Sequence, residues 1–322
     1  MAIAPLLDGL LAVLLFPAAW LMRGVRTLIR AGGISRLPLC RRVLWHVGVF
    51  PIRDHYYEPL FDTRALRQPL DKPRPLPGID WNESQQMAVL SQFRYGDELR
   101  DLPLTPPQIP GSQKQFHFQN NFFEAGDAEY LYNFVRHTKP TRIIEIGSGY
   151  STLIAARAIA QNHRDDPNYC CEHICIEPYE NSWLSQIDVT VIRQPVESVP
   201  LATFQQLHAN DLLFIDSSHM IRPQGDVLFE YLELLPQLNA GVYVHIHDIF
   251  SPCDYPADWL TERIYFWNEQ YLLEAFLSHN SDWQIVGALH DLHRRHFAAF
   301  QAACPFSEPH RSPGSFYIQK IA

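Results

Sequence analysis

Acidic and imidazole side chains stand at the ends of two short apolar runs in this sequence. Asp216 closes one run and is followed three residues later by His219, and the pair His247-Asp248 closes another. Two carboxylates and an imidazole suit a divalent cation such as Mg²⁺, Mn²⁺ or Fe²⁺. We therefore predict a metal site made of Asp216, His247 and Asp248. The alternative is a hydrogen-bonded polar network that closes the strand ends. We expect His245 to point to the opposite face and leave it out.

A glycine turn follows a third apolar run. Glu145 lies two residues before the first glycine of Glu-Ile-Gly-Ser-Gly, and glycines here let the backbone approach a ligand closely. The dinucleotide fingerprint needs a small residue where Thr152 stands, which argues against NAD. A carboxylate at Glu145 would repel a pyrophosphate, but it suits the ammonium group of a bound amino acid. Glu177 closes the next run, where its carboxylate can accept hydrogen bonds from both hydroxyls of a ribose.

Alternating helices and strands must position these side chains. The sequence predicts helices at 126–138, 151–161, 223–235 and 259–276, and strands at 142–146, 172–177, 189–196, 211–216, 241–247, 283–289 and 315–321. Such alternation implies an α/β fold with a doubly wound, mostly parallel, seven-stranded sheet. Ligands of these sheets bind outside the carboxyl ends of the strands, so we expect the polar residues to converge in one crevice.

The stretch from about 116 to 320 resembles the class I S-adenosylmethionine (SAM)-dependent methyltransferases. More narrowly, it is similar to the bacterial macrocin O-methyltransferase-like and cephalosporin hydroxylase-like family. The resemblance rests on IIEIGSGYST, CIEPYE, LLFIDSSH, VHIHDIF and GSFYIQK. It implies SAM as cofactor and a last strand that runs antiparallel. The predicted cofactor site comprises Glu145, Gly147, Ser148, Gly149, Tyr150, Ser151, Glu177 and Asp216.

Within that superfamily, the site also resembles catechol O-methyltransferase-like enzymes. There a metal-binding carboxylate follows the fourth strand, and the general base of the acceptor stands three residues later, usually as lysine. His219 occupies that place here, so we predict Asp216 and His219 as catalytic residues, with His219 as the base. The usual Asp-Asn pair after the fifth strand is replaced here by His247-Asp248, which departs from the metal-binding pattern of these enzymes.

The first residues differ from the rest of the chain. Residues 3–22 are almost wholly apolar and are followed by Arg23, Arg26 and Arg30, which is typical of a membrane anchor with a cytoplasmic basic flank. We predict a cytoplasmic protein attached to the inner face of the membrane. The alternative is a helical hairpin packed on the protein. The predicted parts are a membrane-proximal segment (1–53), a proline-rich connecting region (54–114) and the methyltransferase domain (115–322).

Composition limits the remaining possibilities. The formal charge of −9 gives no support to nucleic-acid binding, and the six cysteines follow no C-x-x-C pattern. We predict a SAM-dependent methyltransferase that modifies a hydroxyl group of a small molecule or of a lipid-linked glycan. Two alternatives stay open: a non-haem iron hydroxylase that uses two histidines and a carboxylate, and a membrane-tethered binding subunit that has lost activity.

Overall fold

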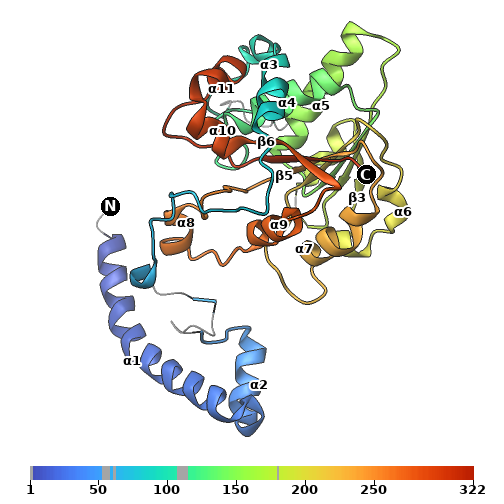
Figure 1. Ribbon diagram of the computed structural model, residues 1–322. Coiled ribbons are helices and arrows are strands. Elements are labelled where there is room, and N and C mark those ends of the chain that lie inside the picture. The colour runs from blue at the N-terminus through green and yellow to red at the C-terminus, as the bar shows by residue number, and fades with distance from the viewer. Residues whose placement is uncertain (1–2, 53–58, 61–62, 107–114, 180) are drawn as a thin grey trace. The chain divides into compact units, whose positions relative to one another are not determined.

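The structure, a computed structural model, describes residues 3–52, 59–60, 63–106, 115–179 and 181–322. The chain forms two compact units, Met1–Pro69 and Leu70–Ala322. Figure 1 shows the second unit as a central sheet with helices on both sides. This confirms the predicted α/β architecture with a helical N-terminal segment.

Seven strands form one sheet in the order β3-β2-β1-β4-β5-β7-β6. Neighbours from β3 to β5 are parallel, whereas β7 runs antiparallel to both β5 and β6, as the resemblance implied. The strands are β1 Arg142–Ile146, β2 Glu172–Ile176, β3 Thr190–Ile192, β4 Leu212–Ile215, β5 Tyr243–Ile246, β6 Trp283–Ala288 and β7 Phe316–Lys320.

Two hydrophobic cores cover the two faces of the sheet. Side chains alternate across a strand, so Ile143 packs into one core and Ile144 into the other. All four residues of β4 are fully buried, as expected for a strand covered on both faces. One layer contains α3 Glu83–Gln92, α4 Asp127–Thr138, α5 Tyr150–Asp165, α10 Leu289–Arg295 and α11 Phe297–Ala303; the other contains α6 Leu201–Phe204, α7 Asp226–Phe229 and α9 Glu269–Leu277.

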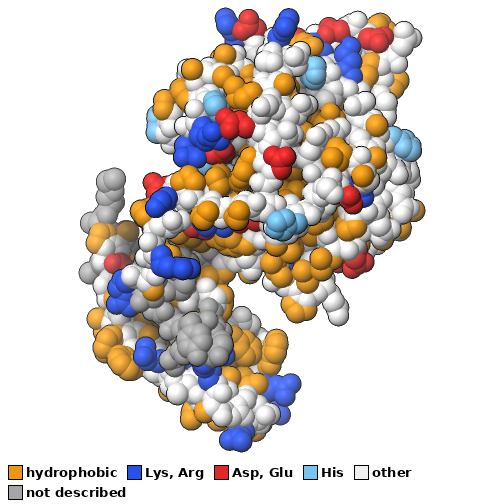
Figure 2. All heavy atoms as spheres, viewed as in Figure 1, with side chains coloured by type: hydrophobic (Ala, Val, Ile, Leu, Met, Phe, Trp, Pro, Cys, Tyr) orange, Lys and Arg blue, Asp and Glu red, His pale blue; other side chains and the backbone are white. Residues whose placement is uncertain are grey.

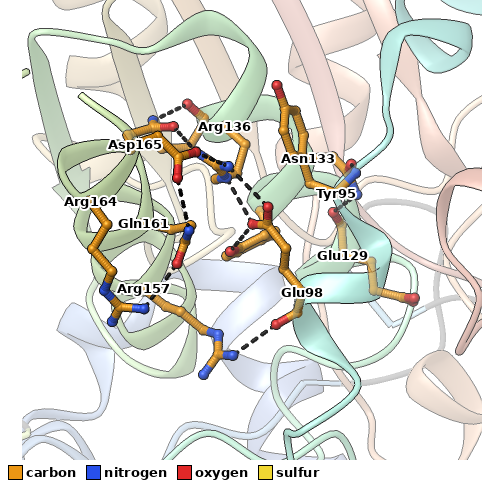
Figure 3. A network of polar contacts seen from close by, with 12 residues as sticks. Tyr95, Glu98, Glu129, Asn133, Arg136, Arg157, Gln161, Arg164 and Asp165 are labelled. Carbon is orange, nitrogen blue, oxygen red and sulfur yellow. Dashed lines mark hydrogen bonds and ion pairs between the residues drawn. The ribbon is translucent and has the colours of Figure 1, made fainter.

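The described residues between 70 and 106 belong to the α/β unit. We predicted a connecting region up to residue 114, but the chain divides at Pro69. Arg74 pairs with Glu274, and Glu98 forms an ion pair of 2.9 Å with the buried Arg136 of α4. Figure 3 shows that Arg136 also reaches Asp165 at the end of α5. Prolines therefore do not make this stretch a linker, because its polar side chains bind it to the domain.

The predicted helix over 259–276 is wrong, because the structure has two short helices there. Helix α8 spans Ala257–Thr261, and α9 begins only at Glu269. Ile264 has a positive φ of 56°, which a helix cannot contain. The backbone N–H groups of Asn268 and Glu269 instead donate to the carbonyl of His219, at 3.0 and 3.2 Å. This break brings the start of α9 to the end of β4.

The N-terminal unit contains the long helix α1, Ile3–Gly32, and the shorter α2, Pro38–Val47. Among the described residues, α1 is the one helix that is long and apolar enough to cross a membrane; its qualifying segment, Leu7–Gly32, has a mean hydropathy of 1.5. Pro17 lies inside this helix.

Candidate active site

The carboxyl ends of β1, β2, β4 and β5 meet at one edge of the sheet. The N–H of Asp216 donates to the carbonyl of Ile146 at 2.8 Å, and the N–H of His247 donates to that of Ile215 at 2.9 Å. These bonds continue the parallel ladder one residue past the strands. The predicted convergence of strand-end residues is therefore present.

At Gly147 the backbone of the turn after β1 lies directly against the backbone that follows β4. Its φ is +77°, and a β-carbon placed there would lie 1.9 Å from the carbonyl oxygen of Asp216. Only glycine can adopt this conformation at so close an approach without displacing the neighbouring strand end. The turn after β1 is thus shaped by contact with the residue that follows β4.

Glu145 lies beneath this turn rather than at its surface. The side chain is fully buried, and its Oε2 accepts a hydrogen bond from the hydroxyl of Thr152. That hydroxyl in turn accepts the N–H of Gly149 at 3.0 Å, at the start of α5. The Nε2 atom of His173 lies 3.2 Å from Oε1 of Glu145; burial opposes protonation of this ring, but the Glu145 carboxylate raises the pKa of His173 to about 10. Glu145 therefore supports the turn from beneath.

A pocket of about 440 Å³ opens beside the turn, between the ends of β1, β2 and β4. Oε2 of Glu177 accepts the N–H of Ser148 at 3.3 Å, and Oε1 accepts the N–H of Tyr179 at 3.0 Å. The Glu177 carboxylate is thereby held at the rim of the pocket. The walls combine apolar surface with carboxylates, as a nucleoside requires: Ile146, Gly147, Ile176, Glu177, Pro178, Tyr179, Pro195, Val196, Glu197, Asp216, Ser217, Ser218, Arg222 and Asp226.

Three residues of the predicted cofactor site line this pocket, namely Gly147, Glu177 and Asp216. The other five, which are Glu145, Ser148, Gly149, Tyr150 and Ser151, are not among its described lining residues. The phenol of Tyr150 instead lies 3.2 Å from Nε2 of His117.

Sequence reasoning missed the contribution of the loops after β3 and β4. Val196 and Glu197 line the pocket, and so do Ser218 and Asp226, whose carboxylate accepts the N–H of Ser218 at 2.9 Å. The sequence marks them by no shared pattern: Val196 ends the predicted strand 189–196, whereas Asp226 lies in the predicted helix 223–235.

His219 is the most tightly held side chain of the site. It is 4% exposed and has a positive φ of 58°. Its Nδ1 lies 2.8 Å from Oε2 of Glu269, whereas its Nε2 lies 3.3 Å from Oδ1 of Asp216 and 3.6 Å from Oδ2 of Asp248. Trp267 lies beside the ring, with centroids 4.4 Å apart. The structure thus places His219 among three carboxylates.

His247 lies on the other side of the same two aspartates. Its Nδ1 is 3.5 Å from Oδ1 of Asp216 and 3.6 Å from Oδ1 of Asp248. Burial opposes protonation of the ring, but these two carboxylates raise the pKa of His247 to about 10. Burial likewise opposes ionisation of Asp216, yet the two imidazoles hold its pKa below the ordinary value. For Asp248 burial prevails and raises the pKa.

A set of three ligand atoms emerges that differs from the predicted one. Asp216, His219 and Asp248 each offer an atom within 4.8 Å of the others. The predicted set contained His247 in place of His219. The two carboxylates and one imidazole nevertheless have the chemistry expected for a divalent cation.

The surroundings of His219 bear on its predicted role as general base. Burial disfavours the charged ring, but hydrogen bonds to Asp216 and Glu269 raise the pKa of His219 well above its ordinary value. A raised pKa favours the charged form of the ring, which is the form that does not accept a proton. The ring lies between Glu269 on one side and Asp216 and Asp248 on the other.

The expectation that His245 points away from His247 is wrong. Residues two apart along a strand share a face. Both rings contact Phe123, with centroids 6.0 and 5.1 Å away. His245 lies deeper, fully buried and stacked on Tyr317 at 4.2 Å, and burial lowers its pKa. His245 therefore lies outside the site because it is buried deeper in the core, although its side chain is on the same face of the sheet as that of His247.

The region of the chain that contains the site is similar to known proteins. The family model described as "Methyltransferase domain" matches residues 144–249. This range includes the glycine turn and the acid–imidazole cluster, by which we mean Asp216, His219, His247 and Asp248. A protein of Archaeoglobus fulgidus described as uncharacterized is 32% identical over 174 residues, covering 50% of this chain and 75% of that protein.

Solved structures show a more distant likeness. The O-methyltransferase TomG from Streptomyces achromogenes, solved with SAM, is 15% identical with a TM-score of 0.37, over 76% of this chain and 92% of that one. An O-methyltransferase from Bacillus cereus is 12% identical with a TM-score of 0.35, over 74% and 91%. Because these identities and TM-scores are low, the family assignment rests on the sequence matches and not on the solved structures.

Proposed function

This chain belongs to the methyltransferase-domain family, and from that premise we propose that it transfers the methyl group of SAM to a hydroxyl group of a small molecule or glycan. One observation carries the proposal. Asp216 lines the nucleoside-sized pocket and is also a member of the acid–imidazole cluster. A donor bound in the pocket would therefore present its reactive end to an acceptor at the cluster.

The donor site would be formed by the pocket. The Glu177 carboxylate, fixed by two backbone N–H groups, would accept hydrogen bonds from the ribose hydroxyls. Ile176 and Val196 supply apolar wall for the adenine. The close approach at Gly147 leaves room for the donor above the turn. Glu145 would support the donor site from beneath, through its hydrogen bond with Thr152.

Methyl transfer needs alignment more than covalent help from the protein. The acceptor oxygen attacks the methyl carbon, the carbon–sulfur bond breaks, and the sulfonium becomes a neutral thioether while the hydroxyl loses its proton. Within the cluster, we propose the Asp248 carboxylate, whose pKa is raised by burial, as the group that accepts that proton. We propose that His219 keeps its proton in the metal-free protein and positions both carboxylates.

The residues present fit a divalent cation. Asp216, His219 and Asp248 would hold it, and Nδ1 of His247, which is buried without a hydrogen-bond partner among the described residues, faces the same two carboxylates. When bound, such an ion would lower the pKa of the acceptor hydroxyl.

Calorimetry tests the donor site. SAM should bind the full chain and NAD should not. Replacing Glu177 by Ala should weaken SAM binding by about 1–3 kcal/mol, the cost of losing a charged hydrogen-bond acceptor. Equal affinity of the variant and the parent chain would remove Glu177 from the site.

Product analysis separates the proposal from the iron hydroxylase alternative. With SAM carrying a labelled methyl group, candidate acceptors should become labelled and S-adenosylhomocysteine should accumulate. A product that gains oxygen in the presence of Fe²⁺, with SAM unconsumed, would decide for hydroxylation.

We also propose that the chain acts at the inner face of a membrane, attached through residues 3–22. The apolar residues 3–22 of α1 and the arginines that follow them within the same helix support this location. A lipid-linked glycan would then be a reachable acceptor. A variant that lacks residues 1–30 should move from the membrane to the soluble fraction; a full chain that is soluble without detergent would indicate a packed helix.

A further inference from the structure

Helix α2 presents an apolar stripe that nothing in its own unit covers. Leu39, Val43 and Val47 are spaced four residues apart and therefore lie on one side of the helix. Their exposed fractions are 72%, 60% and 63%. Trp45 and Phe50 nearby are exposed as well and contact each other, with ring centroids 4.9 Å apart. A ten-residue helix with this much apolar exposure needs a non-aqueous partner.

Charge identifies the kind of partner. From residue 9 to residue 52 the sequence contains six arginines and no Asp or Glu, although the whole chain carries a formal charge of −9. Arg41 and Arg42 belong to α2 itself. At about 100° per residue, Arg41 lies on the side of α2 opposite to Val43. Figure 2 shows hydrophobic side chains together with arginines over this unit.

An apolar stripe backed by arginines is the pattern of a helix that lies in the plane of a membrane surface. A protein partner for such a stripe would need acidic side chains around an apolar groove. A bilayer of anionic phospholipids provides both features at once, namely acyl chains below and phosphates above. Aromatic side chains such as Trp45 and Phe50 prefer this interface too.

We propose that α2 is an in-plane helix that binds anionic phospholipid, with Leu39, Val43 and Val47 toward the acyl chains and Arg41 and Arg42 toward the headgroup phosphates. The proposal deepens the membrane attachment proposed for α1 and adds a lipid preference that a simple apolar anchor lacks. Two helices would then attach the chain to the membrane. Helix α1 would do so through its apolar surface, and α2 through its apolar stripe together with its arginines.

The test follows the environment of α2 in the full-length protein. An environment-sensitive fluorescent amino acid is placed at Val43 or, as matched control, at Arg41. The protein is reconstituted into vesicles of phosphatidylcholine alone or of phosphatidylcholine with about a third of phosphatidylglycerol, enough for a strongly negative surface. The probe at 43 should shift to the blue in anionic vesicles and much less in neutral ones, while the probe at 41 should stay polar.

Two further measurements keep the result interpretable. Arg41→Gln with Arg42→Gln should return the signal at 43 to its level in neutral vesicles, and high salt should do the same because the attraction is screened. Vesicle flotation reports separately on attachment by α1, and methyl transfer in detergent reports on the proposed activity. An unchanged signal at 43 in all lipids, or one already shifted in detergent-free buffer without vesicles, would overturn the proposal.

Discussion

Oε2 of Glu269 lies 2.8 Å from Nδ1 of His219, across fifty residues of sequence. Both side chains are buried, and the second oxygen of Glu269 accepts the hydroxyl of Tyr231 at 3.1 Å. With Nδ1 occupied, the remaining nitrogen of His219 can face only Asp216 and Asp248. A carboxylate behind a histidine in this way fixes the orientation of the ring, as it does behind many metal ligands.

Glu269→Gln should weaken metal binding. The amide keeps the shape but loses the charge that orients and polarises His219, so the affinity for Mn²⁺ should fall by about 10–100-fold. Titration calorimetry with Mn²⁺ measures this directly. Glu230→Gln is the matched control, since Glu230 is equally buried, burial raises its pKa, and its side chain accepts a hydrogen bond from Ser217 instead of pairing with His219. Equal affinities for both variants would contradict the role assigned to Glu269.

Gly147→Ala should abolish SAM binding, whereas Gly149→Ala should be tolerated. At 147 the new methyl group meets the carbonyl of Asp216 and needs a positive φ, so the strand end must move. At 149 the nearest atom is Nδ2 of Asn181, 3.9 Å away, which is ordinary contact. Thermal unfolding should show destabilisation of at least about 1 kcal/mol for the first variant only. Similar SAM affinity in the two variants would show that the close approach does not matter.

Thr152→Val should loosen the turn from beneath. Valine has the same shape but removes the hydroxyl that links Glu145 to the N–H of Gly149. The loss of this cap should cost about 1–2 kcal/mol of stability and weaken SAM binding. Thr152→Ser keeps the hydroxyl and should behave like the parent chain in both assays. If Ser and Val were equally damaging, the methyl group rather than the hydroxyl would be the important part.

Glu129 should make stability depend on pH. Its carboxylate is fully buried and accepts the N–H groups of Gly126 and Phe306, and burial raises its pKa from 4.5 to about 7. The folded protein therefore binds this proton more tightly than the unfolded chain does. Stability from this group is complete below the unfolded pKa and is lost as the pH rises toward 7, by an amount on the order of 3 kcal/mol.

The measurement is chemical denaturation between pH 4.5 and 7 for the parent chain and for Glu129→Gln. Gln carries no titrating proton, so the difference between the two curves isolates Glu129. A constant difference across this range would show that Glu129 titrates normally in the folded protein.

The sheet was predictable because its strands are short apolar runs that end in polar residues. The run Arg142–Ile146 forms β1 with the predicted bounds, and the ends of the neighbouring strands meet as expected. The direction of side chains was less predictable. Glu145 precedes a glycine turn in the way a ligand residue would, but strand pleating and the cap at Thr152 turn its carboxylate inward.

The features that could not be predicted from the sequence depend on contacts between residues that are far apart in the chain. Nothing near Glu269 marks it as a partner of His219, so the interval from 259 to 276, rich in helix formers, reads as one helix. The contact with His219 and the positive φ of Ile264 override that local preference. The stretch around Glu98 reads as a loop for the same reason, since its anchor, Arg136, lies far along the chain.

The strand order has a consequence for synthesis on the ribosome. Strand β7 is the last to be translated, yet it lies inside the sheet, between β5 and β6. Until Phe316–Lys320 leaves the exit tunnel, the nascent chain has β5 as an open edge, and β6 has no partner within the sheet to join. An open edge of this kind can pair with another chain. A ribosome that stalls over the loop before β7 would therefore release a product that aggregates rather than one that is merely inactive.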